Sequence, residues 1–146
     1  MTLGRRDRVL AVDFGDRRTG LAGTDPTGTI ISPLEPLVGL DQGECANAVA
    51  QLARERRSEV VVVGLPLAAQ GEVGHRAQRT LGFVEVLRSV SPCPVETFDE
   101  RNTTDEAHAR LKRGGLKAAQ RRRLADSVAA LVILERFREA DARGRQ

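Results

Sequence analysis

The chain has 146 residues, of which 40% are hydrophobic and 29% are charged, and its formal net charge is +3. This length suits one domain with a buried core, which we expect to span residues 1–146. No apolar run approaches the roughly 20 residues that cross a bilayer. The charged N-terminus is not followed by the apolar segment of a signal peptide. These features argue against a membrane protein and predict a cytoplasmic one.

The residues that commonly build metal and stacking sites are sparse. Cys45 and Cys93 lie far apart and have no histidine at metal-ligand spacing, so we expect neither a zinc site nor a redox pair. His75 is interpreted as a solvated helix residue. The chain has no Trp, no Tyr and four Phe, so the aromatic platforms on which single-strand binders stack bases are not expected.

The first part of the chain predicts an antiparallel meander of three strands. A short apolar run that ends in Asp13 is typical of a buried strand. Turn residues at 25–28 separate the second strand from the third. Pro33 and Pro36 restrict the third strand to a sheet edge. We expect strands over 9–13 and 19–24, and a third that opens at 29–32.

The rest of the chain alternates between helix and strand. Asp41 is a candidate N-cap, and apolar residues at helical spacing follow it as far as Arg57. The valines at 60–63 do not alternate with polar residues, which predicts a parallel strand buried on both faces. The remaining elements are expected to be a helix over 71–90, a strand over 94–98, a helix that begins at Thr103 or Thr104, and a helix over 118–140. This order predicts an α/β fold around a mixed five-stranded sheet.

Two acidic positions follow predicted strands. Asp13 ends a buried strand, where an unpaired charge is costly. A metal ion explains an acid held there, and a surface aspartate that caps the turn is the alternative. Asp99 and Glu100 end another strand, and ligand sites in open α/β sheets lie at such carboxyl ends. Because strand residues alternate sides, only one of these two can face Asp13.

A third acid lies on the last predicted helix. Asp126 shares a helix face with three apolar residues, Ala130, Ile133 and Phe137, so its carboxylate is aimed into the fold. A favourable interaction with the helix dipole, helped by the arginines at 122–123, is the structural alternative. Several carboxylates at one point favour a hard divalent cation, Mg²⁺ or Mn²⁺. Two such ions could clamp the attacking water and the leaving oxygen of a phosphodiester.

Basic residues accompany the predicted acidic site. The segment 112–123 contains six basic residues and no acid, which is the footprint of a protein that binds a polyanion such as nucleic acid. A solvated charge run is the alternative. We expect nucleic-acid phosphates to be bound by Arg17, Arg18, Arg101, Lys117, Arg121, Arg122 and Arg123. Acids for a metal beside bases for phosphates indicate phosphodiester hydrolysis.

These motifs together resemble the YqgF family, also called the RuvX or Holliday-junction-resolvase-like family, described as nucleases of small-subunit ribosomal RNA precursors. The resemblance runs from about residue 8 to residue 140. Its motifs are Asp13-Phe14-Gly15, Val63-Gly64-Leu65-Pro66, Asp99-Glu100-Arg101 and Asp126-Ser127-Val128. It implies a ribonuclease H-like fold and a metal-dependent nuclease whose acidic triad is Asp13, Glu100 and Asp126. Asp99 or Glu96 is the candidate for a fourth ligand.

Three functions stay open on the sequence. The leading hypothesis is a divalent-metal nuclease that acts on the ribosomal RNA precursor or on branched or single-stranded DNA; a homodimer would suit a two-fold branched substrate. The second is a non-catalytic nucleic-acid-binding factor in ribosome assembly or transcription. The third is nucleotide handling, because Asp-Phe-Gly followed by Gly-Leu-Ala also resembles the phosphate loop of actin-like ATPases and sugar kinases. Those proteins enclose a nucleotide between two such domains.

Overall fold

The structure, a computed structural model, describes residues 7–67, 71, 73–100 and 118–144, and for 118–124 and 143–144 it describes the backbone only. Its elements, in chain order, are β1 (Val9–Asp13), β2 (Arg18–Thr24), β3 (Ile31–Val38), α1 (Gln42–Glu55), β4 (Val60–Leu65), α2 (His75–Val90), β5 (Val95–Asp99) and α4 (Ala118–Gly144). The helix expected from Thr103 or Thr104 lies outside the described residues. The predicted alternation of elements is otherwise confirmed.

The five strands form one sheet in the order β3-β2-β1-β4-β5. β2 runs antiparallel to β1 and β3, whereas β4 and β5 run parallel to β1. This confirms the mixed sheet and the parallel, fully buried β4. β3 is an edge strand, as its prolines predict, but it continues through both of them to Val38. An edge position tolerates them because no further strand needs their missing N–H groups.

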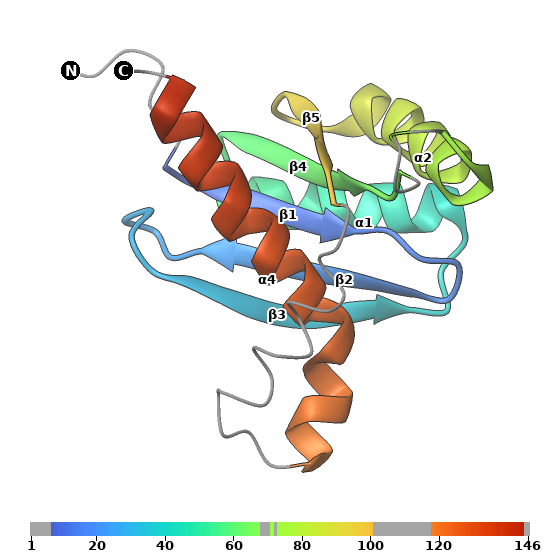
Figure 1. The fold of residues 1–146 in the computed structure, drawn as a ribbon, viewed down its shortest axis with the longest axis horizontal. Helices are drawn as coiled ribbons and strands as arrows, with labels where there is room; N and C mark the ends of the chain where they lie inside the picture. The colour runs from blue at the N-terminus through green and yellow to red at the C-terminus, as the bar shows by residue number, and fades with distance from the viewer. Residues whose placement is uncertain (1–6, 68–70, 72, 101–117, 145–146) are drawn as a thin grey trace.

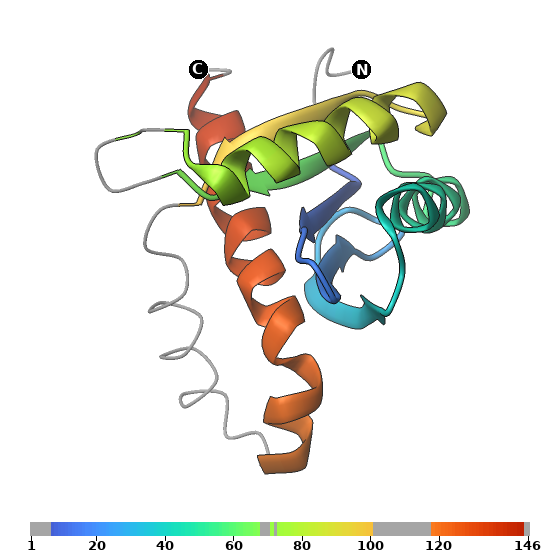
Figure 2. The same cartoon turned by 90° about the vertical axis from the view of Figure 1, so that its right-hand side faces the viewer.

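Helices cover both faces of the sheet (Figures 1 and 2). α1 and α2 pack on one face and α4 packs on the other. Along β1, Leu10 and Val12 belong to the cluster under α1 and α2, while Val9 and Ala11 belong to the cluster under α4. Because successive side chains alternate, Asp13 falls on the α4 side of the sheet.

The helix boundaries follow from local backbone chemistry. Asp41 is the N-cap of α1 as predicted: its carboxylate accepts from the backbone N of Glu44 at 2.8 Å, and Glu44 reciprocates at 3.0 Å. The predicted start of α2 at residue 71 is wrong by four residues, because Gly71 has a φ of 85° and Gly74 is an extended N-cap. None of the helices in the described ranges combines the length and apolarity that a bilayer crossing requires.

Candidate metal centre

The carboxyl groups of Asp13 and Glu100 meet at the carboxyl ends of β1 and β5. Glu100 follows β5 directly, and its backbone N donates to the carbonyl of Leu65 at 3.1 Å. Its side chain shares a hydrogen bond with Asp13. Glu100 is 8% exposed, so this contact is made out of bulk water. The structure therefore brings two of the three predicted acids together.

A glycine between the two strands makes this contact possible. β4 separates β1 from β5 in the sheet, so Glu100 must reach over β4 to meet Asp13. Gly64 lies at the crossing: a Cβ there would stand 2.7 Å from Oε2 of Glu100 and 2.4 Å from Cδ1 of Ile133. The carboxylate of Glu100 therefore occupies space that a side chain at position 64 would fill.

Burial gives the pair unusual acid–base properties. It raises the pKa of Asp13 to about 6 and, together with the neighbouring Asp13 charge, raises the pKa of Glu100 to about 8. The hydrogen bond between them raises the pKa of Glu100 and lowers that of Asp13, so protonated Glu100 is the donor and Asp13 the acceptor. The pair therefore retains a proton near neutral pH. A bound cation could replace this proton and balance the negative charge of the two carboxylates.

Asp126 is held beside this pair by the way α4 packs on β2. Gly20, the register partner of Asp13, lies directly under the helix, and a Cβ on it would overlap the backbone carbonyl of Asp126 at 1.8 Å. This close approach brings the Asp126 charge near enough to raise the pKa of Asp13. Oδ2 of Asp126 also lies 3.8 Å from Nη1 of Arg18.

The position of Asp126 along α4 bears on its two sequence interpretations. α4 begins at Ala118, so Asp126 lies two turns inside the helix. The favourable effect of a helix dipole on an acid is confined to the first turn. Ala130, Ile133 and Phe137 are buried on the sheet, as their spacing predicts. The observed geometry thus favours a carboxylate presented by an apolar helix face over a dipole partner.

Ser127, the residue after Asp126 in α4, forms hydrogen bonds with β2 and β3 next to a shift in their register. The β2–β3 register shifts between Thr19 and Leu21. Ser127 bridges this gap: its Oγ accepts from the N of Leu21 at 3.2 Å and donates to the carbonyl of Leu34. Ser127 is fully buried. Sequence periodicity gives no sign of this role, because a buried serine is neither an apolar core residue nor a charged site residue.

Ser127→Ala is expected to lower the free energy of unfolding by about 1–3 kcal/mol, because the Leu21 N–H and the Leu34 carbonyl lose their shared partner inside the protein. Urea unfolding measures this loss. The control is Ser89→Ala, which removes an exposed hydroxyl that donates to the carbonyl of Val86 in its own helix. That change should stay within about 0.5 kcal/mol. Equal effects of the two variants would contradict the bridging role of Ser127.

The acids as they stand provide oxygen ligands for a hard cation. In the described part of the chain no three acidic, histidine or cysteine side chains lie close enough to form a metal cluster. Asp13 and Glu100 nevertheless form a two-carboxylate pair with the Asp126 charge beside it, and this all-oxygen chemistry fits Mg²⁺ or Mn²⁺. Asp99, the last residue of β5, stands in register with Leu65 of β4. Its charge raises the pKa of Glu100.

The predicted basic residues are placed unevenly. Arg18 lies close to Asp126. Arg17, its neighbour in the sequence, is exposed. Arg101 and Lys117 lie outside the described residues. The segment 121–123 belongs to the first turns of α4, which project beyond the edge of the sheet in Figure 1, and its side chains are not described.

Sequence reasoning missed an arginine at the site. Arg76, in the first turn of α2, acts on both carboxyls and lowers the pKa of each. It lines a pocket of about 230 Å³ with Phe14, Gly15, Asp16, Arg79 and Thr80. Arg79 Nη1 is fixed 2.6 Å from Oδ1 of Asp16. The chain topology could have indicated this arginine, because a helix that follows the carboxyl end of β4 starts near the ligand-binding edge of the sheet.

A family model described as "RuvX: Holliday junction resolvase" matches residues 7–140. The chain belongs to the RuvX family. RuvX relatives to which it is similar include a "Putative pre-16S rRNA nuclease" of Streptomyces avermitilis, 38% identical over 138 residues that cover 94% of this chain and 88% of that protein. A protein of the same name from Kineococcus radiotolerans is 42% identical over 138 residues, which cover 92% of this chain and 73% of that protein.

Solved structures show the fold of this RuvX chain. It matches RuvC of Thermus thermophilus with a TM-score of 0.57 at 19% identity, covering 86% of this chain and 92% of that one. It matches the Fowlpox virus resolvase, solved with Holliday junction DNA, with a TM-score of 0.57 at 14% identity, covering 91% and 97%. These likenesses confirm the α/β order that the sequence predicts and the ribonuclease H-like fold that the family resemblance implies.

Proposed function

We propose that this RuvX-family chain is a divalent-metal-dependent nuclease that cleaves phosphodiester bonds in the precursor of the small-subunit ribosomal RNA. The observation that carries the proposal is the hydrogen-bonded Asp13–Glu100 pair at the carboxyl ends of two parallel strands, with Asp126 beside it. The names of the relatives support the RNA substrate.

Three carboxylates of this chain would hold Mg²⁺ or Mn²⁺: Asp13 and Glu100 from the sheet and Asp126 from α4. When bound, such a cation would polarise a phosphoryl oxygen and lower the pKa of a bound water, which makes hydroxide available to attack the phosphorus. Asp13 lies in the β1–β2 pair opposite Gly20. Glu100 is confined by the space over Gly64. Such confinement keeps the carboxylates in place and reduces reorganisation during the reaction.

The basic residues that flank the carboxylates would hold the substrate. Arg18, the first residue of β2, lies 3.8 Å from Asp126. Arg76, in the first turn of α2, acts on Asp13 and Glu100 through its charge. The two guanidinium groups therefore come to the acids from different elements. Guanidinium groups bind phosphate through paired N–H donors. We propose that these two arginines orient the phosphodiester, while Asp99 modulates Glu100 from the neighbouring strand position.

The direct test is cleavage of a panel of substrates with Mg²⁺, with Mn²⁺ or with a chelator. The panel contains precursor 16S rRNA, mature 16S rRNA, single-stranded DNA and a DNA Holliday junction. Wild type is assayed beside Asp13→Asn, which keeps the shape of the side chain and removes its charge. We expect metal-dependent cleavage of the precursor by wild type, and retained RNA binding with no cleavage by the variant.

Two results would overturn the proposal. Cleavage that persists unchanged in Asp13→Asn would place the activity elsewhere or in a contaminant. RNA binding without cleavage in either metal would identify a non-catalytic binding factor. Preferential cleavage of the Holliday junction would keep the chemistry and replace the proposed substrate.

A further inference from the structure

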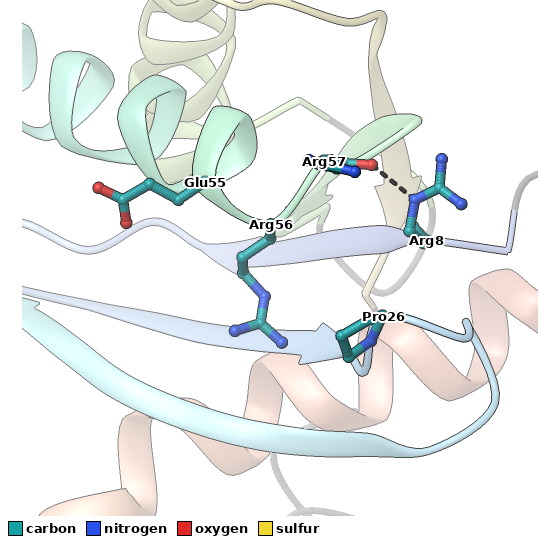
Figure 3. A pocket seen from close by; sticks show the side chains of 5 residues that line it. All are labelled: Arg8, Pro26, Glu55, Arg56 and Arg57. Carbon is teal, nitrogen blue, oxygen red and sulfur yellow. Dashed lines mark hydrogen bonds between the residues drawn. The ribbon is translucent and has the colours of Figure 1, made fainter.

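A second basic site lies at the other end of the sheet. Arg8, Arg56 and Arg57 line a pocket of about 490 Å³ together with Pro26 and Glu55 (Figure 3). Arg8 precedes β1, whereas Asp13 ends it, so the pocket is separated from the carboxylates by the five residues of the strand, about 15 Å. Its volume is within the range of small-molecule sites.

Arg56 is held in place before any ligand arrives. Its Nη2 donates to the carbonyl of Thr24 at 2.6 Å. Its guanidinium lies on Gly23 of β2, where a Cβ would stand 2.8 Å from Nε and 3.0 Å from Nη2. Figure 3 shows the side chain reaching from the end of α1 towards β2 and Pro26. A guanidinium fixed in this way loses little side-chain entropy when it binds an anion.

Arg57 has a backbone conformation that usually belongs to glycine. Its φ is 54°, which makes it the only non-glycine residue of positive φ in the described ranges. This left-handed turn ends α1 and directs the Arg57 carbonyl to Nε of Arg8 at 2.8 Å. Glycine is the common residue at such helix ends because a side chain there is strained. The Arg57 guanidinium makes no hydrogen bond or ion pair with any described residue. No interaction of this side chain with the described residues therefore stabilises the end of the helix.

The lining of the pocket has three arginines and one acidic residue, Glu55. Arg8 is partly neutralised by Glu59, with Nη1 and Oε1 3.5 Å apart. Glu55 accepts a hydrogen bond from Gln51 of its own helix, and in Figure 3 its carboxylate points away from Arg8 and Pro26. Arg56 and Arg57 have no acidic partner among the described residues. Two of the three guanidinium groups that line the pocket therefore form no ion pair with a described residue, and guanidinium is the donor set that best matches a phosphoryl group.

We propose that Arg8, Arg56 and Arg57 form a phosphoryl-binding site separate from the carboxylate centre. The phosphoryl group comes either from the backbone of a nucleic acid or from a small phosphorylated ligand. The left-handed backbone of Arg57 supports this site, because non-glycine residues that the surrounding structure holds in such a conformation cluster at ligand-binding sites. It does not depend on nuclease activity, since binding at this end of the sheet uses none of the acids.

The test compares binding of three probes without divalent cations: inorganic phosphate, AMP and a single-stranded oligouridylate. The variant is Arg57→Gly, which removes the guanidinium and relieves the backbone. The matched control is Arg54→Gln, which removes an exposed arginine of the same helix that bonds the carbonyl of Val90. Calorimetry measures the small probes, and fluorescence anisotropy over a salt series measures the oligonucleotide. Thermal unfolding is recorded for each variant.

We expect Arg57→Gly to keep or raise the Tm while its affinity for a phosphoryl probe falls about tenfold, the loss of one charge-assisted contact. If the site binds nucleic acid, oligouridylate loses affinity and the slope of log K against log salt falls by about 0.7. If it binds a small ligand, phosphate and AMP lose affinity and oligouridylate does not. Either result supports the site. Equal affinities of Arg57→Gly and Arg54→Gln for all three probes would overturn it.

Discussion

Replacing Glu100 with glutamine is expected to reduce metal-dependent cleavage about 10³-fold and, at the same time, to stabilise the metal-free protein at alkaline pH. Loss of one carboxylate that holds the cation removes several kcal/mol of transition-state stabilisation. The fold should survive, because the glutamine amide can donate to Asp13 as protonated Glu100 does. Cleavage of precursor 16S rRNA and thermal unfolding on the same preparation measure both effects.

The stability effect follows from the direction of the two pKa changes. Folding raises the pKa of Asp13 from 3.8 to about 6 and that of Glu100 from 4.5 to about 8. The folded chain therefore binds more protons than the unfolded chain between about pH 4 and pH 8, and its stability falls as the pH rises through that range. Glu100→Gln removes a carboxylate that must ionise in a buried site. We expect a gain of about 1–3 kcal/mol at pH 8 and a much smaller one at pH 5.

A matched control separates this effect from loss of any acid. Glu85→Gln removes an exposed carboxylate that pairs with Arg88 on α2, and it should change neither cleavage nor the pH profile of unfolding. Mn²⁺ should stabilise wild type more at about pH 8 than at pH 5, because cation and proton compete for the same pair. A Glu100→Gln protein that is no more stable than wild type at high pH would contradict the buried, proton-sharing pair.

Several features of the site could be read from the sequence because they depend on periodicity. The apolar run of β1 predicts Asp13 at the strand end, and strand alternation predicts that only one residue of the Asp99–Glu100 pair faces it. The structure selects Glu100. That choice depends on Gly64 in the neighbouring strand, and a contact across three strands has no periodic signature in one sequence.

The positions of two arginines, Arg76 and Arg57, could not be predicted, because they depart from what helix spacing and helix-end residues usually indicate. Arg76 is an exposed helix residue by its spacing, and its nearness to the carboxyls follows from where α2 starts. Arg57 marks a helix end at which glycine would be expected. Its conformation is visible only in the backbone. Both arginines are charged residues in places where a solvated side chain is the ordinary interpretation, so local sequence cannot distinguish them.

Gly20→Ala is expected to cost more stability than any other single methyl group near the site, more than about 3 kcal/mol, and to abolish cleavage. The new Cβ would lie 1.8 Å from the carbonyl oxygen of Asp126. That atom belongs to the backbone of α4, so relief requires the whole helix to move, which disturbs the packing of Ile133 and Phe137 on the sheet. Urea unfolding and cleavage measure the two losses.

Two further alanine substitutions sharpen the prediction. Gly43→Ala places a methyl group in α1 with no contact closer than 3.6 Å and should stabilise slightly, as alanine does within a helix. Gly64→Ala meets the ends of two side chains, Glu100 and Ile133, which can rotate away. It should therefore lose cleavage with a smaller loss of stability than Gly20→Ala. If Gly20→Ala unfolded like Gly43→Ala and still cut RNA, then α4 would not need its close contact with β2, and Asp126 would have no reason to be part of the catalytic centre.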